Sequence, residues 1–111
     1  MTGRFDVTHD VFQADFCADR LKALSDPHRL RIVSLLQSGE FTVSDIAELL
    51  ETDIVKISHH LKIMKHALLV QVRRDGRFMY YRLHADLLQS GGRNGTYLDL
   101  GCCRLQVPDA G

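Results

Sequence analysis

The sequence lacks the features that mark several large classes of protein. No stretch approaches the roughly 18 consecutive apolar residues of a membrane-spanning helix, so we expect no membrane partner. The first ten residues are polar and include acids, unlike a signal peptide, and we expect a cytoplasmic location. Only three cysteines are present, too few for a paired disulfide framework, and in that compartment we expect them to be thiols.

Catalytic motifs and a net charge are missing as well. The chain has no Gly-rich phosphate loop, no H-E-x-x-H and no G-x-S-x-G, so we predict that it is not an enzyme. Its formal net charge is zero, which alone argues weakly against nucleic acid. The segment from Ile54 to Leu83, however, contains seven basic residues and a single acid, Asp75, and so has a net charge of +6. A neutral protein with one basic face can still bind phosphates.

What is present fits one small domain. With 111 residues, of which 45% are apolar, the chain can build one modest core, and we predict a single domain over residues 1–111. A chain this short often completes its core by dimerising. Apolar residues at helical spacing, with capping residues before them, predict four helices. These are Phe12–Leu24, Pro27–Gln37, a helix that begins at Thr42, and Ile54–His66.

The period then changes to that of strands. Residues 69–73 alternate, Asp75-Gly76 is a turn signal, and Phe78–Leu83 is rich in aromatic residues, which together predict a β-hairpin with arginines at its tip. Beyond it we predict one or two helical turns in Ala85–Gln89, a glycine-rich loop, and an extended segment over Thr96–Val107.

The predicted order of elements is two short helices joined by a tight turn, followed by a basic hairpin. This is the order found in a winged helix-turn-helix. We therefore predict a mainly α fold with a small β-hairpin wing (α+β) and an atypical extended C-terminal segment. The DNA-binding core would span about residues 21–83, and dimerisation and sensing elements would lie in about 10–24 and 84–108. The alternatives are a winged helix used only for protein–protein contact, and a solvated amphipathic helix with an ordinary charged hairpin. The net charge of +6 across the fourth helix and the hairpin favours DNA.

The fourth helix has an apolar side that can dock on the domain and a polar side that can enter a major groove. Short polar groups in its first half could read bases, and the arginines of the hairpin could reach phosphates or the minor groove. The candidate DNA-binding residues are Thr52, Asp53, Lys56, Ser58, His59, Lys62, Arg73, Arg74 and Arg77.

Three stretches then support a resemblance to a known family. The sequences LSDPHRLRI (Leu24–Ile32), ISHHLK (Ile57–Lys62) and RDGRFMYYRL (Arg74–Leu83) resemble, in order and spacing, motifs of the ArsR/SmtB family of repressors. The resemblance implies a cytoplasmic homodimer on a pseudo-palindromic double-stranded operator, released by an inducer. It also implies that Ser58 and His59 face the groove and that His60 is structural. Where the family usually has glycine after this helix, the chain has Leu68, whose cost of about 1 kcal/mol at φ > 0 favours a re-formed turn.

The inducer site is less conventional. The family's Cys-Val-Cys metal site aligns with Thr42-Val43-Ser44, which has no thiol, and only His84 and Asp86 suggest its C-terminal site. The three cysteines, Cys17, Cys102 and Cys103, lie outside the DNA-binding core. They could form a soft trigonal site for As(III), Cd(II), Pb(II) or Cu(I). Since the family's dimer interface contains the first helix and the C-terminal element, Cys17 of one protomer could meet Cys102 or Cys103 of the other.

Two alternatives remain for these cysteines. The first is a reversible disulfide or persulfide response between Cys17 and one C-terminal cysteine. In the second, the cysteines are small buried hydrophobes and the repressor has no thiol-based inducer. Adjacent cysteines in a strand point to opposite faces, so we do not expect Cys102 and Cys103 to bond to each other. The six histidines are not expected to cluster as a metal site.

Overall fold

A computed structural model describes residues 13–91 and 95–108 of the chain. It contains the four predicted helices, although Phe12, the predicted first residue of the first helix, lies outside the described residues. The helices are α1 (Ala14–Leu24), α2 (Pro27–Leu36), α3 (Val43–Leu49) and α4 (Ile54–His66). The strands are β1 (Phe41–Thr42), β2 (Val70–Asp75), β3 (Phe78–Leu83), β4 (Leu88–Gly91), β5 (Gly95–Asp99) and β6 (Arg104–Leu105).

Short-range capping explains where the middle helices begin. The Asp26 carboxylate accepts the backbone N–H groups of His28 and Arg29 at 2.8 and 3.2 Å, and Pro27 occupies the first position of α2. At α3, Thr42 and Asp45 form the reciprocal capping box that the sequence predicts. These caps fix the start of both helices from local sequence alone.

The predicted hairpin is the centre of the first sheet. Strands β2 and β3 pair antiparallel from Val70↔Leu83 to Asp75↔Phe78. Gly76 opens the two-residue turn with φ 61°, a conformation that glycine adopts without a steric penalty. The short strand β1 adds to the other edge of β3, which gives the order β1-β3-β2. Strand β1 could not be predicted from the sequence, because its two residues carry no strand pattern of their own.

The C-terminal region differs in part from the prediction. In place of helical turns over Ala85–Gln89, a short turn leads into β4, which pairs with β5, and β5 pairs with β6. The predicted extended segment is thus two strands of a second antiparallel sheet with order β4-β5-β6. The helix prediction was wrong because pairing with a distant strand outweighed a weak local preference.

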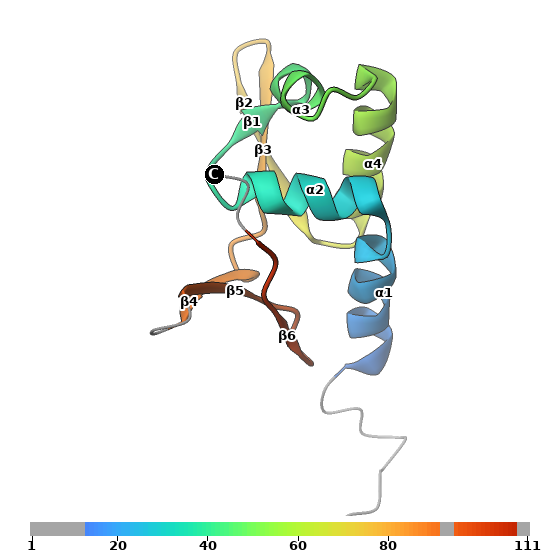
Figure 1. The fold of residues 1–111 in the computed structure, drawn as a ribbon, viewed down its shortest axis with the longest axis vertical. Coiled ribbons are helices and arrows are strands. Elements are labelled where there is room, and N and C mark those ends of the chain that lie inside the picture. The colour runs from blue at the N-terminus through green and yellow to red at the C-terminus, as the bar shows by residue number, and fades with distance from the viewer. Residues whose placement is uncertain (1–12, 92–94, 109–111) are drawn as a thin grey trace, which may run out of the picture.

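Both sheets share one hydrophobic core with the helices. Ile57 and Leu61 of α4 are fully buried, and so are Leu87, Leu98 and Leu100 from the C-terminal region. Figure 1 shows the second sheet at the end of the molecule away from the tip of the β2–β3 hairpin. Among the described residues, no helix is both long and apolar enough to cross a membrane.

Candidate nucleic-acid interface and thiol cluster

Helix α4 separates a buried side from an exposed one. Its side chains at Ile57, Leu61 and Met64 are fully buried against the domain. The positions i, i+3, i+4 and i+7 on the other side are all exposed, and they are Val55, Ser58, His59 and Lys62. Lys56 is exposed beside them. This face therefore offers hydroxyl, imidazole, ammonium and methyl groups together.

Val55 is the member of this face that sequence analysis missed. Its side chain is apolar, yet it is 72% exposed. The signal that could have identified it is its helical spacing from Ser58, His59 and Lys62. A valine methyl on a groove-facing helix can contact the methyl group of thymine.

Thr52 and Asp53 shape the start of α4. The Thr52 hydroxyl donates to the carbonyl of Leu50 at 2.9 Å, and the Asp53 carboxylate accepts the N–H of Val55 at 2.7 Å. The hydroxyl proton of Thr52 is therefore used within the protein, and the Asp53 carboxylate would repel a phosphate. Both side chains thus make contacts at the start of α4, and a DNA contact by either stays a prediction.

The hairpin arginines fall into two kinds. Arg74 and Arg77 are exposed at the tip, where Arg77 lies over the ring of Phe78 at 5.3 Å. Arg73 is instead engaged by Glu40, with three N···O distances between 3.0 and 3.2 Å, and lies over the ring of Tyr80. The hydrogen bond from Arg73 lowers the pKa of Glu40, so both partners stay charged. The bidentate pair joins the hairpin to the segment before β1 and neutralises one arginine.

A polar cluster connects the start of α2 to the inner edge of α4. An Arg29 guanidinium nitrogen lies 3.1 Å from Nδ1 of His60, and the rings of His28 and His60 stack with centroids 5.1 Å apart. Burial lowers the pKa of His60, Arg29 lowers it further, and the Asp26 carboxylate opposes both. Sequence analysis did not expect histidines to cluster, yet Asp26, His28 and His60 place ligand atoms within 4.8 Å of one another. Arg29 contacts His60, and the two imidazole rings are stacked. This geometry fits a structural contact between α2 and α4 better than a metal site.

The three cysteines come together within one chain. Cys17 of α1 and Cys102 form a disulfide with their Cα atoms 6.0 Å apart, where sequence analysis expected thiols. Cys103 remains a free thiol, and all three sulfur atoms lie within 4.8 Å of one another. A contact between protomers is not needed to assemble this thiol cluster.

A tight turn explains how two adjacent cysteines reach the same partner. Cys102 and Cys103 lie between β5 and β6 rather than within a strand, so their side chains need not point to opposite faces. The Gly101 N–H donates to the Asp99 carboxylate at 2.9 Å, and the Leu100 N–H donates to the Cys103 carbonyl at 2.9 Å. Gly101 has φ 97°, which favours glycine.

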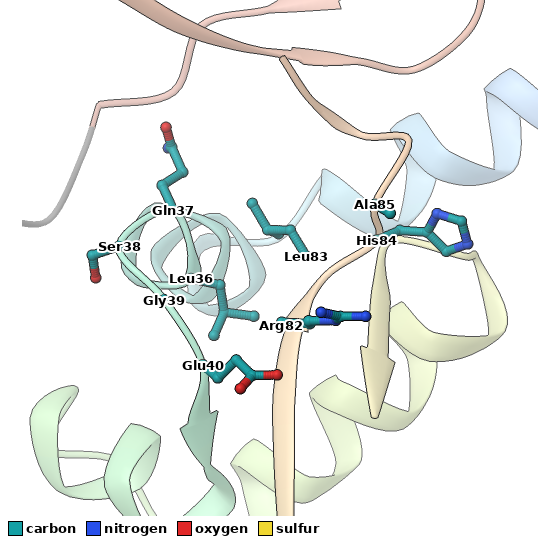
Figure 2. A pocket seen from close by; sticks show the side chains of 9 residues that line it. All are labelled: Leu36, Gln37, Ser38, Gly39, Glu40, Arg82, Leu83, His84 and Ala85. Atoms are coloured by element: carbon teal, nitrogen blue, oxygen red, sulfur yellow. The ribbon is translucent and has the colours of Figure 1, made fainter. Parts of the chain in front are cut away.

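A separate pocket of about 390 Å³ lies between the end of α2 and the end of β3, and Figure 2 shows the side chains that line it. Its lining comprises Leu36, Gln37, Ser38, Gly39, Glu40, Arg82, Leu83, His84 and Ala85. The Glu40 carboxylate on its wall is already bound by Arg73. We assign no ligand to this pocket.

Comparison with known proteins agrees with this arrangement. The sequence pattern of the family described as "Bacterial regulatory protein, arsR family" matches residues 26–72. Transcriptional repressor SdpR of Bacillus subtilis is 46% identical over 68 residues, which cover 61% of this chain and 76% of that protein. An arsenical resistance operon repressor of Staphylococcus xylosus is 35% identical over 85 residues, covering 74% of this chain and 82% of that protein.

A solved structure extends the likeness to three dimensions. The homodimeric winged helix-turn-helix DNA-binding domain of a possible ArsR-family regulator from Mycobacterium bovis superposes with a TM-score of 0.64. It is 34% identical, and the match covers 77% of each chain. The chain therefore belongs to the ArsR family of winged helix-turn-helix transcriptional regulators.

Proposed function

We propose that two copies of this chain form a repressor that binds double-stranded operator DNA through α4 and the β2–β3 hairpin. The observation that carries this proposal is the exposed face of α4, on which Val55, Ser58, His59 and Lys62 share one side. The homodimeric state of the Mycobacterium bovis domain supports the dimer. Two copies related by a twofold axis would present two such helices to successive major grooves.

The contacts divide by chemistry. Ser58 and His59 offer hydrogen bonds to base edges, and Val55 offers a methyl group to thymine. Lys56 and Lys62 on α4, with Arg74 and Arg77 on the hairpin, provide cations for phosphates. Thr52, Asp53 and Arg73 hold these groups in place through the contacts described above.

The salt dependence of operator binding tests the cationic contacts. Each lost phosphate contact should reduce the slope of log K against log salt by about 0.9, so Arg74→Ala with Arg77→Ala should reduce it by roughly 2. Lys22→Gln removes a cation from the exposed side of α1 and should leave the slope unchanged. A slope that is the same in the double variant would show that the hairpin does not touch DNA.

For the inducer, we infer that the thiol cluster binds a soft metal or metalloid and that its occupation weakens operator binding. Three sulfur donors from α1 and the turn after β5 suit As(III), Cd(II), Pb(II) or Cu(I), which prefer thiolates. The Cys17–Cys102 bond must first be reduced, and the three thiols then lie close enough for a trigonal set. The segments around residues 10–24 and 84–108 would form the sensing and dimerisation part.

The Cys17–Cys102 pairing favours a second candidate, a redox response. In that case the two thiols lose two electrons and two protons to an oxidant such as a peroxide, which is reduced to water. A persulfide R–S–SH could oxidise the same pair to the disulfide instead, being itself reduced to the thiol R–SH and hydrogen sulfide. Only Cys17 and Cys102 are needed for this chemistry, whereas the trigonal site needs Cys103 too.

Cys103→Ser therefore separates the two candidates. Reduced protein is titrated with As(III), Cd(II) and Cu(I), or treated with peroxide, while operator binding is followed. A metal sensor loses its metal response in Cys103→Ser, whereas a redox sensor keeps its peroxide response in the same variant. If Cys102→Ser combined with Cys103→Ser still responds as the unaltered chain does, the inducer does not act through these thiols.

A further inference from the structure

Arg20 is a buried cation that the DNA-binding and thiol sites do not account for. Its side chain lies on α1 three residues after Cys17, on the same side of the helix, and the two residues are 4% and 3% exposed. The guanidinium lies over the ring of Phe16 at 4.5 Å. A buried arginine needs a compensating partner, because removing its charge from water is costly.

That partner is the end of the recognition helix. A terminal nitrogen of Arg20 donates to the carbonyl of Leu68 at 2.8 Å, across 48 residues of sequence. Leu68 has the left-handed φ of 58° and lies between the end of α4 and the start of β2. It therefore sets the direction in which the hairpin leaves α4, and Figure 1 shows α1 beside that end of α4.

The same guanidinium is also influenced by the turn that carries Cys102. Burial lowers the pKa of Arg20, while the carboxylates of Asp86 and Asp99 raise it, so both acids lie within electrostatic reach. Asp99 accepts the N–H of Gly101 and so shapes the turn before Cys102. One side chain thus lies within electrostatic reach of the residue that shapes the turn beside Cys102 and donates to the main chain at the end of α4.

The hydrogen bonding of Arg20 is incomplete. Within the described part of the chain, its Nε is buried and has no hydrogen-bond partner. Such a group is expensive in a static anchor, and it calls for a physical explanation. A second arrangement, in which Asp99 approaches Nε once the turn at Cys102 has shifted, would supply the missing partner.

We propose that Arg20 is the positioning residue that couples the state of the thiol cluster to the angle between α4 and the hairpin, an inference that rests on the thiol part of the proposed function. Cys17 and Arg20 belong to one rigid helix, so a change at the sulfur atoms displaces both. The displacement moves the carbonyl of Leu68, and with it the relative placement of α4 and β2. Occupation of the thiol cluster thereby changes operator affinity without any contact between sulfur and DNA.

The test measures the ratio of operator Kd values with the thiol cluster in its two states. The states are fully reduced against peroxide-oxidised protein, and reduced against As(III)-loaded protein. Coupling between two sites typically amounts to about 5- to 150-fold in affinity. Arg20→Gln should bring the ratio to within about twofold of unity, with oxidation still visible by thiol counting and As(III) still bound. Arg20→Lys keeps the charge and should retain part of the ratio.

The matched control is Lys22→Gln, which removes the same charge from an exposed position on the same helix and should keep the full ratio. If the ratio of Kd values is one for the unaltered chain with both treatments, the thiol part of the proposed function fails. If it shows a ratio that Arg20→Gln preserves, the coupling role of Arg20 fails while the thiol sensor stands. If neither Arg20 variant shows a cooperative thermal unfolding transition, the variants are not folded. Arg20 is then a structural anchor and the inference is wrong.

Discussion

Leu68 has an unfavourable backbone conformation at the turn that joins α4 to β2. The resemblance to the ArsR family predicts glycine at this position, and a leucine favoured a rebuilt turn. The structure keeps the left-handed turn with φ 58° instead. The Leu69 N–H donates to the Met64 carbonyl at 2.9 Å, and that bond, together with Arg20, holds the strained residue.

Leu68→Gly should raise the free energy of unfolding by about 0.5–1 kcal/mol, because glycine adopts positive φ without a Cβ clash. Urea unfolding at equilibrium measures the change. Leu68→Ala is the control, since it removes the same side-chain contacts and keeps the Cβ. Equal stabilities of the two variants would show that φ at Leu68 stores no strain.

At the level of elements, the placement of α4 depends on the start of α2. Arg29 donates to the Ala23 carbonyl and lies against His60, while His28 stacks on the same imidazole. The cluster works with His60 neutral, because burial and the nearby guanidinium both disfavour a second cation. We therefore expect the orientation of α4 to depend on the protonation state of His60.

This arrangement predicts a loss of stability in mild acid. The pKa of His60 is lowered from its ordinary value of 6.5, so below that pH the unfolded chain binds the proton more readily than the folded one. Stability should then fall as the pH decreases from about 6.5 towards the folded pKa. His60→Asn, whose amide oxygen can replace Nδ1 as an acceptor for Arg29, should reduce this slope. Urea midpoints at pH 7.5 and 5.5 measure the slope.

One control variant and the lower pH range of Asp26 identify the group responsible. His66→Asn alters an exposed histidine at the end of α4 that is not among the groups acting on His60, and it should keep the slope of the unaltered chain. Asp26 acts in a lower range, because its backbone hydrogen bonds outweigh burial and hold its pKa below 3.8, so its stabilisation is lost only as the pH falls through that region. An unchanged slope in His60→Asn would assign the acid sensitivity to another group.

For the molecule as a whole, the Cys17–Cys102 bond joins residues that are 85 positions apart. In the chain-entropy description, a loop of this length stabilises the fold by about 4–5 kcal/mol by restricting the unfolded state. Reduction should therefore lower the free energy of unfolding by up to that amount. Cys17→Ser, measured with and without reductant, should be insensitive to reduction. If reductant leaves the stability of the unaltered chain the same, the bond does not form in solution.

Local signals in the sequence were sufficient for the helices and the hairpin. The cap at Asp26, the capping box at Thr42 and the turn at Gly76 are short-range features, and the structure has each of them. Non-local contacts could not be read in this way. The pairing of Arg73 with Glu40 and the bond from Arg20 to Leu68 join segments whose approach depends on the complete fold.

The candidate site shows the same division. Helical spacing indicated an exposed polar side of α4, but Val55 was judged by its apolar character and missed. The cysteines were grouped as one site because they lie outside the DNA-binding core. Their assembly within a single chain could not be foreseen, because it depends on the turn at Gly101, which brings Cys102 and Cys103 towards α1.

The Cys17–Cys102 bond also has a topological consequence. It closes a covalent ring that contains α2, α3, α4 and the whole β2–β3 hairpin. A single backbone cut at the exposed hairpin tip, for example by trypsin after Arg77, would open this ring without separating the pieces. On a denaturing gel, the cleaved protein would migrate as one species without reductant and as two fragments with reductant. Limited proteolysis can therefore report the redox state of the cysteines from a cut outside the thiol cluster.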